Sequence, residues 1–455
     1  MIDINDTIVA VSTAHGIGGI AVIRVSGNQA IEIVNSAWQG INLVKAKSHT
    51  AHLGYIIDKQ GNPIDQVVLT IYRNPKSFTG EDIIEIACHG SLWIQRELTN
   101  ELVRRGCRPA RGGEFSQRAF LNGKIDLAEA EGIADLIASS SRAAHRLAIS
   151  QMRGDFSKKL SDLRQKLLNF VSLLELELDF SEEDVEFADR SQLVQLATTI
   201  KNIVDKLADS FSIGTSIKDG IPVAIAGVTN VGKSTLLNKL LHEEKAIVSD
   251  IHGTTRDFVE DTIEIKGILF RFIDTAGLRD TTDIVENLGI ERAEKKIKDA
   301  SLLLWVIDPT VEINPQIDRL RHVQQSLTEE QKLIIVVNKK DIATIDTQLI
   351  GEYNVVEISA KTGEGINELE RQLVATYETE TEKHDIIITN ARHYQALIKA
   401  SETLERILDG LDNGLPGDFV SQDIRECMHY LGEITGNITT DDLLGNIFAN
   451  FCIGK

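Results

Sequence analysis

The segment from Gly227 to Thr235 has the residue types and the spacing of a phosphate-binding loop. It follows an apolar run at 223–226 and precedes an amphipathic run, so the sequence predicts a strand, a loop and a helix. Its two glycines allow the backbone to turn N–H groups toward an anion. Lys233 adds a charge for the β and γ phosphates, and the Ser234 hydroxyl can ligate Mg²⁺. A glycine-rich turn without a ligand is the alternative for this segment taken alone.

Three later segments each follow a predicted strand, and each offers a group that a guanine nucleotide needs. Asp274 can hold Mg²⁺ through water, and Gly277 can give an N–H to the γ-phosphate. In Asn338-Lys339-Lys340-Asp341 the last carboxylate can accept from both N1–H and the 2-amino group of guanine, a pairing that adenine lacks. Ser359-Ala360-Lys361 can supply a backbone contact to guanine O6. In this order the segments resemble those of a Ras-like GTP-binding domain.

The stretch between the phosphate loop and Asp274 has residues that could close over the nucleotide. Within Gly253-Thr254-Thr255-Arg256-Asp257, Thr255 is predicted to give its hydroxyl to Mg²⁺ while the γ-phosphate is present, with Thr254 nearby. The residue after Gly277 is Leu278, where Ras-like enzymes commonly place a glutamine that orients water. Because leucine has neither a donor nor an acceptor, an arginine from a partner, a second metal ion or an acid elsewhere must position the water.

Oxygen atoms near the loop could hold a monovalent cation in the place of that arginine. Asn230 offers a carbonyl oxygen, and Ser249 and Thr254 offer hydroxyl or main-chain oxygens. From the spacing alone, a role for Asn230 as a turn residue only is an equally good interpretation.

Length and composition indicate a globular protein of about three domains. The chain has 455 residues, of which 42% are hydrophobic, and its four cysteines are scattered without a Cys-x-x-Cys pair. Neither a zinc site nor a disulfide framework is therefore expected. The acidic amino terminus and the lack of a long apolar run predict a cytoplasmic protein without a membrane span.

The charge distribution limits how nucleic acid could bind. The net charge is −20, whereas residues 1–120 hold 12 basic and 11 acidic side chains. Broad, sequence-independent binding to phosphates is disfavoured, because it needs a basic face. A local patch or a partner's surface would be required.

The period of the apolar residues changes along the chain and predicts a multidomain α/β protein. A long stripe from Leu160 to Leu178 indicates helix packing, and the acidic segment at 175–189 is expected to be a helix end or a loop. Strands are predicted at 8–11, 19–25, 67–72 and 83–87, helices at 92–105, 391–411 and 418–434, a hairpin that turns at Lys266-Gly267, and linkers at 214–220 and 378–383. The predicted domains are 1–120, an α+β domain; 121–217, the first part of a helical domain; 218–380, an inserted Ras-like GTPase domain; and 381–455, the second part of the discontinuous helical domain.

Beyond the nucleotide-binding segments, the whole chain resembles the MnmE (TrmE) family of tRNA-modification GTPases. The resemblance is carried by the segments Gly18 to Gly27, Phe78 to Asp82, Gly113 to Lys124 and the terminal Phe451-Cys452-Ile453-Gly454-Lys455. It implies a K⁺-activated GTPase whose G domains pair face to face in a homodimer held by the amino-terminal domains.

The resemblance also implies roles for single residues of the nucleotide site. Asn230, Ser249, Ile251 and Thr254 would contact K⁺, although Ser249 departs from a usual threonine while keeping its oxygen. Ser234 and Thr255 would hold Mg²⁺. Glu286 would orient water in place of the missing glutamine and act with Lys233 in catalysis. The residues expected at GTP are Asn230, Val231, Gly232, Lys233, Ser234, Thr235, Ser249, Asp250, Ile251, His252, Gly253, Thr254, Thr255, Asp274, Thr275, Ala276, Gly277, Asn338, Lys339, Asp341, Ser359, Ala360 and Lys361.

The amino-terminal region resembles folate-dependent aminomethyltransferases. Arg24, Glu81, Lys124 and Lys455 match positions expected at a pocket for 5-formyl- or methylene-tetrahydrofolate, where opposite charges serve the pterin and the glutamate tail. Cys452 has two open interpretations: an inert small apolar residue, or a catalytic residue whose thiolate Lys455 favours.

The function that follows from the resemblance is a GTP-driven cycle that supports tRNA modification. An aminomethyl-type group (carboxymethylaminomethyl) would be added to C5 of a wobble uridine with a folate one-carbon unit. The family's FAD-dependent partner MnmG (GidA) would share the tRNA in a heterotetramer or a larger complex.

Two rival functions are a ribosome-assembly or RNA-chaperone GTPase and a folate enzyme with a regulatory GTPase. The first usually carries a basic RNA-binding appendage, yet residues 382–455 hold 6 basic and 12 acidic side chains and no Gly-x-x-Gly loop on a basic helix.

Overall fold

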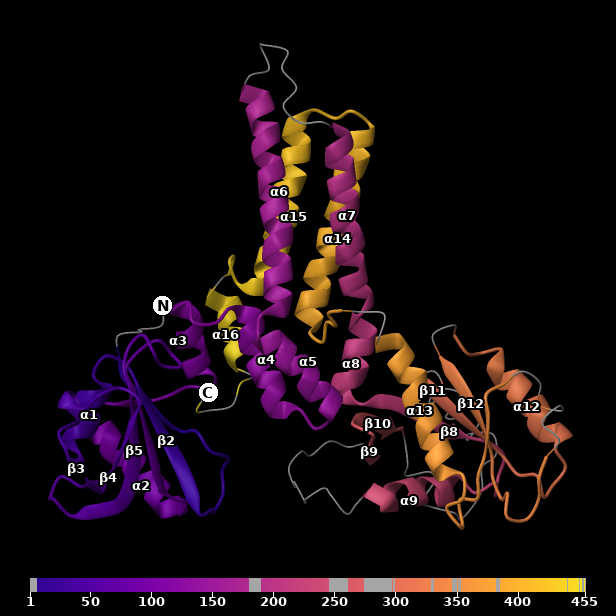
Figure 1. Ribbon diagram of the computed structural model, residues 1–455, viewed down its shortest axis with the longest axis horizontal. Coiled ribbons are helices and arrows are strands. Elements are labelled where there is room, and N and C mark those ends of the chain that lie inside the picture. The colour runs from indigo at the N-terminus through magenta and orange to yellow at the C-terminus, as the bar shows by residue number, and fades with distance from the viewer. Residues whose placement is uncertain are drawn as a thin grey trace. The chain divides into compact units, whose positions relative to one another are not determined.

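The computed structural model describes residues 6–179, 190–244, 261–273, 297, 299–328, 331–345, 350, 353–381, 385–439, 441–449, 451 and 454. The chain divides into two compact units. Unit 1 comprises Met1–Ile137, Ile149–Leu193 and Asp409–Lys455, and unit 2 comprises Ala138–Ala148 and Val194–Leu408. Both units hold sheets and helices (Figure 1).

Unit 1 contains a seven-stranded sheet in the order β3-β4-β5-β6-β2-β1-β7. One of its faces is buried because apolar residues alternate along the strands, and helices α1 and α2 pack against that face. Apolar side chains of β4 and β5 remain exposed on the other face, such as the cross-strand pair Leu53 and Val68. The strands are β1 (Ile8–Val11), β2 (Ile20–Ser26), β3 (Trp38–Gln39), β4 (Thr50–Ile57), β5 (Pro63–Tyr72), β6 (Ile83–His89) and β7 (Arg108–Pro109), and the helices are α1 (Ala30–Ser36) and α2 (Leu92–Arg104).

The predicted elements of this region are found, with additions. The four predicted strands correspond to β1, β2, β5 and β6, and the predicted helix corresponds to α2. The prediction missed β4, whose exposed positions include apolar residues that break the expected alternation.

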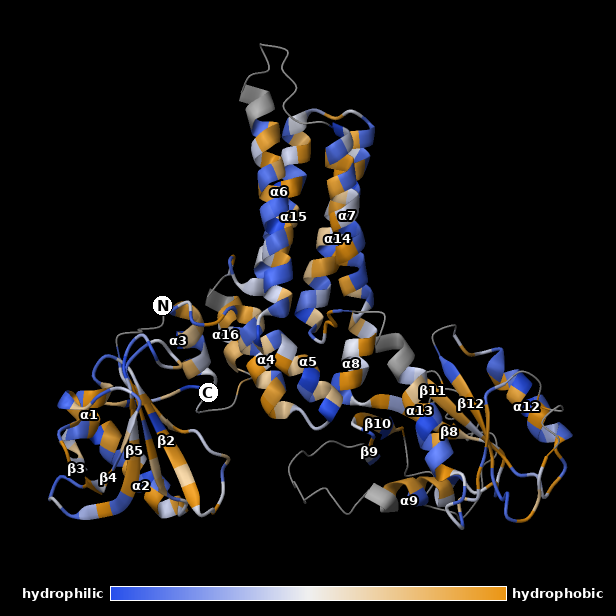
Figure 2. Ribbon diagram, viewed as in Figure 1, coloured by the Kyte–Doolittle hydropathy of each residue, from blue (hydrophilic) through white to orange (hydrophobic). Residues whose placement is uncertain are grey.

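The rest of unit 1 is helical. Long helix α6 (Asp155–Asp179) packs along α15 (Gly417–Thr435) through the predicted apolar stripe, in which Leu160, Leu163 and Leu167 are buried. Hydrophobic and hydrophilic residues interchange along both helices in Figure 2. Leu168 is 44% exposed and does not belong to the stripe. The shorter helices are α3 (Glu114–Leu121), α4 (Leu127–Ala138), part of α5 (Arg142–Met152) and α16 (Asp441–Ala449).

Unit 2 contains a six-stranded sheet in the order β13-β12-β11-β8-β10-β9. All neighbouring strands are parallel except β9 and β10, which form the predicted hairpin at Lys266 and Gly267. Central strand β11 is buried along its whole length, which explains its uninterrupted apolar sequence. The elements are β8 (Ile221–Ala226), β9 (Asp261–Ile265), β10 (Ile268–Phe272), β11 (Leu302–Ile307), β12 (Lys332–Val337), β13 (Val355–Glu357), α7 (Arg190–Asp209), α8 (Phe211–Asp219), α9 (Lys233–Glu244), α12 (Asn314–Gln324), α13 (Ile366–Thr381) and α14 (Ala391–Asp412).

The two predicted linkers are wrong. Gly214 lies within α8, where an added Cβ would come 2.0 Å from the carbonyl oxygen of Ile388, so the glycine permits a close approach rather than a flexible joint. Helix α13 continues to Thr381, through most of the second linker. The predicted boundaries at 120, 217 and 380 all fall inside helices, and the domain division stays a prediction.

Three of the four cysteines lie among the described residues. Cys88, Cys107 and Cys427 are buried and form no disulfide, and burial raises the pKa of Cys88 to about 11 and that of Cys107 to about 12. No helix among the described residues is both long enough and apolar enough to cross a membrane.

Candidate nucleotide site and candidate pocket of the amino-terminal region

The phosphate loop joins the end of β8 to the first residue of α9, as predicted. Gly227 and Gly232 have φ angles of 144° and 95°, which favour glycine. A Cβ at Gly227 would lie 2.4 Å from the Val306 carbonyl oxygen, and one at Gly232 would lie 2.3 Å from Asn338 Nδ2. Asn230 also has a positive φ, of 63°. The loop therefore depends on glycine both for its conformation and for its close neighbours.

Lys233 lies at the start of α9 and turns back over the loop. Its Nζ donates to the carbonyl oxygens of Gly227 at 3.0 Å and of Val228 at 2.8 Å. Burial, and then repulsion from Arg319 on α12, lower the pKa of Lys233. Ser234 and Thr235 follow in the first turn of α9, where N–H groups and the helix dipole favour an anion.

Asn338 connects the phosphate loop to the predicted guanine-binding segments. It follows β12 and is 3% exposed. Its Nδ2 donates to the Val231 carbonyl oxygen at 2.8 Å, and its Oδ1 accepts from the N–H of Ala360 at 2.9 Å. One amide side chain thus holds three chain segments at the carboxyl edge of the parallel strands, where α/β proteins commonly bind ligands.

The other residues of these two segments divide into exposed and buried groups. Asp341 and Lys361 are exposed at this edge, whereas Ser359 is buried. The Ser359 hydroxyl accepts from the N–H of Thr362 at 3.2 Å, and the Ser359 N–H donates to the Glu364 carbonyl oxygen at 2.8 Å. The edge thus presents a carboxylate to solvent beside a loop whose backbone is fixed.

Several predicted site residues lie outside the described residues. They are Ser249, Asp250, Ile251, His252, Gly253, Thr254, Thr255, Asp274, Thr275, Ala276, Gly277, Glu286, Cys452 and Lys455.

In unit 1, Arg24 on β2 lies between a carboxylate, two aromatic rings and the end of the chain. Its Nε and Nη2 donate to Glu85 Oε1 at 3.0 and 2.8 Å. The guanidinium carbon lies 5.3 Å from the Phe78 ring centroid and 5.6 Å from that of Phe115. The Gly454 carbonyl oxygen accepts from Arg24 Nη1 at 3.4 Å.

The same carbonyl oxygen of Gly454 accepts from the Ser12 hydroxyl at 3.1 Å. A Cβ at Gly454 would lie 2.4 Å from the Val11 carbonyl oxygen, so Gly454 packs against the end of β1. Tyr72 lies on β5, which pairs with β6, the strand that carries Glu85. Burial, and then the Glu85 carboxylate, raise the pKa of Tyr72.

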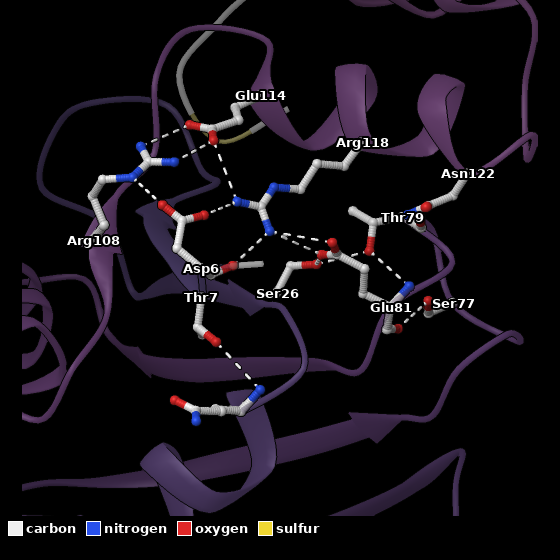
Figure 3. A network of polar contacts seen from close by, with 11 residues as sticks. Asp6, Thr7, Ser26, Ser77, Thr79, Glu81, Arg108, Glu114, Arg118 and Asn122 are labelled. Carbon is white, nitrogen blue, oxygen red and sulfur yellow. Dashed lines mark hydrogen bonds and ion pairs between the residues drawn. The ribbon is translucent and has the colours of Figure 1, made fainter. Parts of the chain in front are cut away.

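Glu81 is almost fully buried and takes part in a charged network (Figure 3). Its Oε2 accepts from the Ser26 hydroxyl at 2.7 Å, and its Oε1 accepts from Arg118 Nη1 at 3.2 Å. Arg118, on α3, is 1% exposed and also pairs with Asp6 and Glu114. This cluster of Asp6, Glu81, Arg108, Glu114 and Arg118 is called the Arg118 network below.

The network lowers the pKa of two of its carboxyl groups, Glu114 and Asp6. Burial alone would raise the pKa of Glu114, but hydrogen bonds from Arg108 and from the Arg111 N–H outweigh it and lower that pKa. The pKa of Asp6 is lowered in the same way, because bonds from Arg108 and Arg118 exceed the effect of its burial.

Lys124 lies near the loop that carries Glu81. Its Nζ donates to the Pro75 carbonyl oxygen at 3.0 Å in an exposed position. A Cβ at Gly80 would lie 3.2 Å from the Cγ of Lys124. Arg24 and Glu81 are joined more closely, because Glu81 bonds to Ser26, two residues beyond Arg24 on β2.

Comparison with known proteins shows the family. The MnmE helical domain model matches residues 127–452, and the model of the GTP-binding protein TrmE N-terminus matches residues 7–124. The tRNA modification GTPase MnmE of Bacteroides thetaiotaomicron is 51% identical, with 99% of both chains covered. The protein of the same name from Cytophaga hutchinsonii is 49% identical over 99% of this chain and 98% of the relative. The chain belongs to the MnmE family. The predicted family and fold class are thereby confirmed.

In this MnmE-family chain, sequence reasoning missed Arg118 and Asp308. Arg118 lies within the Gly113 to Lys124 segment that carries the family resemblance, but nothing in its spacing links it to Asp6, 112 residues earlier. Asp308 follows β11 at the same edge as the phosphate loop and pairs with Lys339. Its position after a buried strand was the available signal, because polar residues at strand ends in parallel sheets gather at one edge.

Proposed function

We propose that this MnmE-family chain uses K⁺-activated GTP hydrolysis to drive the modification of C5 of a wobble uridine in tRNA. GTP hydrolysis in tRNA modification is the activity of the family to which the chain belongs. The observation that carries the proposal is the full-length relationship combined with the phosphate loop and Asn338 at one sheet edge. The added group is of the aminomethyl type (carboxymethylaminomethyl), and its carbon comes from 5-formyl- or methylene-tetrahydrofolate.

The described part of the nucleotide site fits GTP with Mg²⁺. The glycines at 227 and 232 stand where any Cβ would collide, which keeps the N–H groups of the loop close to a bound phosphate. Lys233 is half-buried beside the loop carbonyls and can turn to the β and γ phosphates. Ser234 would hold Mg²⁺ together with Thr255, and the ion would neutralise charge on the phosphates.

The cation K⁺ would take the place of the arginine that activates Ras-like enzymes, and Glu286 the place of their glutamine. Asn230 fits a ligand role, since its left-handed backbone places a residue with a side-chain oxygen on the exposed part of the loop. Ser249, Ile251 and Thr254 would complete the set. Glu286 would orient the attacking water.

The amino-terminal region supplies charges and rings that suit a folate. Arg24 stacks on Phe78 and Phe115, and together with Lys124 and Lys455 it offers cations for the glutamate tail. Glu81 would face the pterin, held by Ser26 and Arg118. Cys452 would be a catalytic thiol, and the packing of Gly454 beside Arg24 supports its proximity to this pocket.

The proposed assembly is a homodimer held by the amino-terminal regions, which binds tRNA together with the FAD-dependent MnmG (GidA). An exposed apolar face on the seven-stranded sheet supports pairing of two copies, because Ile20 on β2 and Leu53 on β4 are each more than half exposed and Val68 on β5 is 43% exposed. The proposed cytoplasmic location agrees with the absence of a membrane-spanning helix among the described residues.

One experiment tests the whole proposal: binding of labelled tetrahydrofolate to the purified chain, combined with nucleoside analysis of tRNA from a strain that lacks its gene. We expect saturable folate binding and loss of the modified wobble uridine. Normal tRNA nucleosides together with altered ribosome profiles would favour the rival ribosome-assembly function. Folate binding with unchanged tRNA would favour a stand-alone folate enzyme.

A further inference from the structure

Asp308 lies outside the four predicted nucleotide-binding segments but pairs with one of them. Its side chain is 5% exposed, and its Oδ2 accepts a hydrogen bond from Lys339 Nζ. Lys339 stands between Asn338, which holds the phosphate loop, and Asp341, the predicted partner of guanine. Its backbone has a φ of 63°, in the left-handed region that lysine rarely adopts.

The carboxylate of Asp308 is fixed by the turn that follows it. Its Oδ1 accepts from the N–H of Thr310 at 2.9 Å and from the Thr310 hydroxyl at 2.6 Å. Oδ1 therefore accepts hydrogen bonds from the turn, and Oδ2 accepts one from Lys339. Hydrogen bonds from neutral donors to the first oxygen orient the second without competing for the lysine charge.

The backbone of Asp308 is held by a single side chain of helix α12. Gln316 is 2% exposed, and its Oε1 accepts from the Asp308 N–H at 3.0 Å. Its Nε2 donates to the carbonyl oxygens of Asp308 at 2.9 Å and of Glu312 at 3.1 Å. Because both backbone groups of Asp308 bond to one buried amide, the position of the carboxylate is set by α12.

We infer that Asp308 is a positioning residue for guanine-nucleotide binding, which acts by holding the Lys339 ammonium at the nucleotide edge, and that Gln316 of α12 sets its position. This inference rests on the proposed binding of guanine nucleotide at that edge. A lysine side chain is a point charge on a flexible stem, and ordering it at the moment of binding costs affinity. A lysine that Asp308 already holds in place loses little further freedom when the nucleotide binds. The nucleotide is therefore bound more tightly, and released more slowly, than with a free lysine side chain.

The test is the dissociation rate of a fluorescent GDP analogue, N-methylanthraniloyl-GDP, from the full-length chain. Four proteins are compared: wild type, Asp308→Asn, Lys339→Met and the double variant. Asp308→Asn keeps the size and the acceptor for Thr310 but removes the charge. We expect it to accelerate release by about tenfold, the typical loss for one charge-assisted hydrogen bond. In the Lys339→Met background the same change should have no further effect.

Asp318→Asn is the matched control, because Asp318 also pairs with a cation on α12, Arg321 at 3.3 Å, but is 71% exposed. Its release rate should equal that of the wild type. An unchanged or slower release from Asp308→Asn would overturn the inference, as would an effect that persists fully in the Lys339→Met background, since that is the result of a purely structural role. If the wild type does not bind the GDP analogue, the proposed nucleotide function itself fails, and the inference fails with it.

Discussion

The polar groups at the nucleotide edge of unit 2 come from short contiguous motifs, whereas those of the Arg118 network in unit 1 come from distant parts of the chain. Gly227 to Ser234 run from the end of β8 into the first turn of α9, and Asn338 to Asp341 follow β12 directly. Arg118, by contrast, bonds to Asp6 across 112 residues and to Glu81 across 37. The nucleotide edge leaves Asp341 and Lys361 exposed, while the network buries Arg118, Glu114 and Glu81 almost completely.

This difference shows two ways of preparing a charged group for a ligand. At the nucleotide edge, the groups that would contact the phosphates are mainly backbone N–H groups and a helix N-terminus. Their placement depends little on the surrounding core. In the Arg118 network, buried charged side chains hold one another in position. Removing one of them should therefore change both the geometry of the network and the free energy of unfolding. The first arrangement should tolerate substitutions in its vicinity better than the second.

The largest expected effect comes from Arg118→Met, which tests that link. It leaves the carboxylate of Glu81 buried without its cation, while Glu114 keeps only its pair with Arg108. Breaking a buried pair in this way typically costs about 3–5 kcal/mol. Urea unfolding followed by circular dichroism would measure the loss. Arg104→Met is the control in the same unit, because Arg104 is 49% exposed and its buried partner Glu101 keeps a pair with Arg105, so this variant should lose far less stability. Equal losses for the two variants would contradict the proposed contrast.

Glu286→Ala should keep the affinity for GTP and reduce turnover by about 100-fold, as removal of a water-orienting carboxylate typically does. Phosphate release measures turnover, and equilibrium binding of a fluorescent GTP analogue measures affinity. The free energy of unfolding should not change, in contrast to Arg118→Met. Unchanged turnover would assign water positioning to another residue.

Exchange of Na⁺ for K⁺ at constant ionic strength should raise GTP turnover by at least about tenfold, because the cation stabilises charge in the transition state. Asn230→Ala should remove most of this difference. Equal rates in the two salts would contradict the cation site. Unfolding of unit 1 should be the same in both salts, which again separates the two regions.

A smaller effect is expected from pH. The pKa of Glu114 lies below its ordinary value of 4.5 and that of Asp6 below 3.8, so their contribution to stability is complete above about pH 4.5 and is lost as the pH falls through the lower folded-state values. The free energy of unfolding should therefore decrease as the pH falls from about 5 to about 3. Unfolding curves at several pH values measure this, and Arg118→Met should weaken the dependence. A dependence that the variant leaves intact would place its origin in other carboxylates.

The sequence predicted those parts of the fold and site whose signals are local. The phosphate loop was found because glycine, lysine and serine must follow one another between a strand and a helix, and the buried strand β12 was recognisable from its apolar run. Arg118 and Asp308 were missed because their roles depend on partners that only the fold brings near.

The linker predicted at Gly214 was wrong. Gly214 resembled a linker residue because glycine weakens helices, yet it lies inside α8, where the Ile388 carbonyl oxygen leaves no room for a side chain. Sequence alone does not distinguish a glycine that provides flexibility from one that provides space.

The three buried cysteines have a practical consequence for spectroscopy. Maleimide reagents attack thiolates, and Cys88 and Cys107 are shielded from solvent with pKa values of about 11 and about 12. With Cys452 replaced by serine, a thiol introduced at an exposed position of each unit could carry a fluorophore or a spin label while the native thiols stay unmodified. Distances between such labels would then follow the two units through the nucleotide cycle.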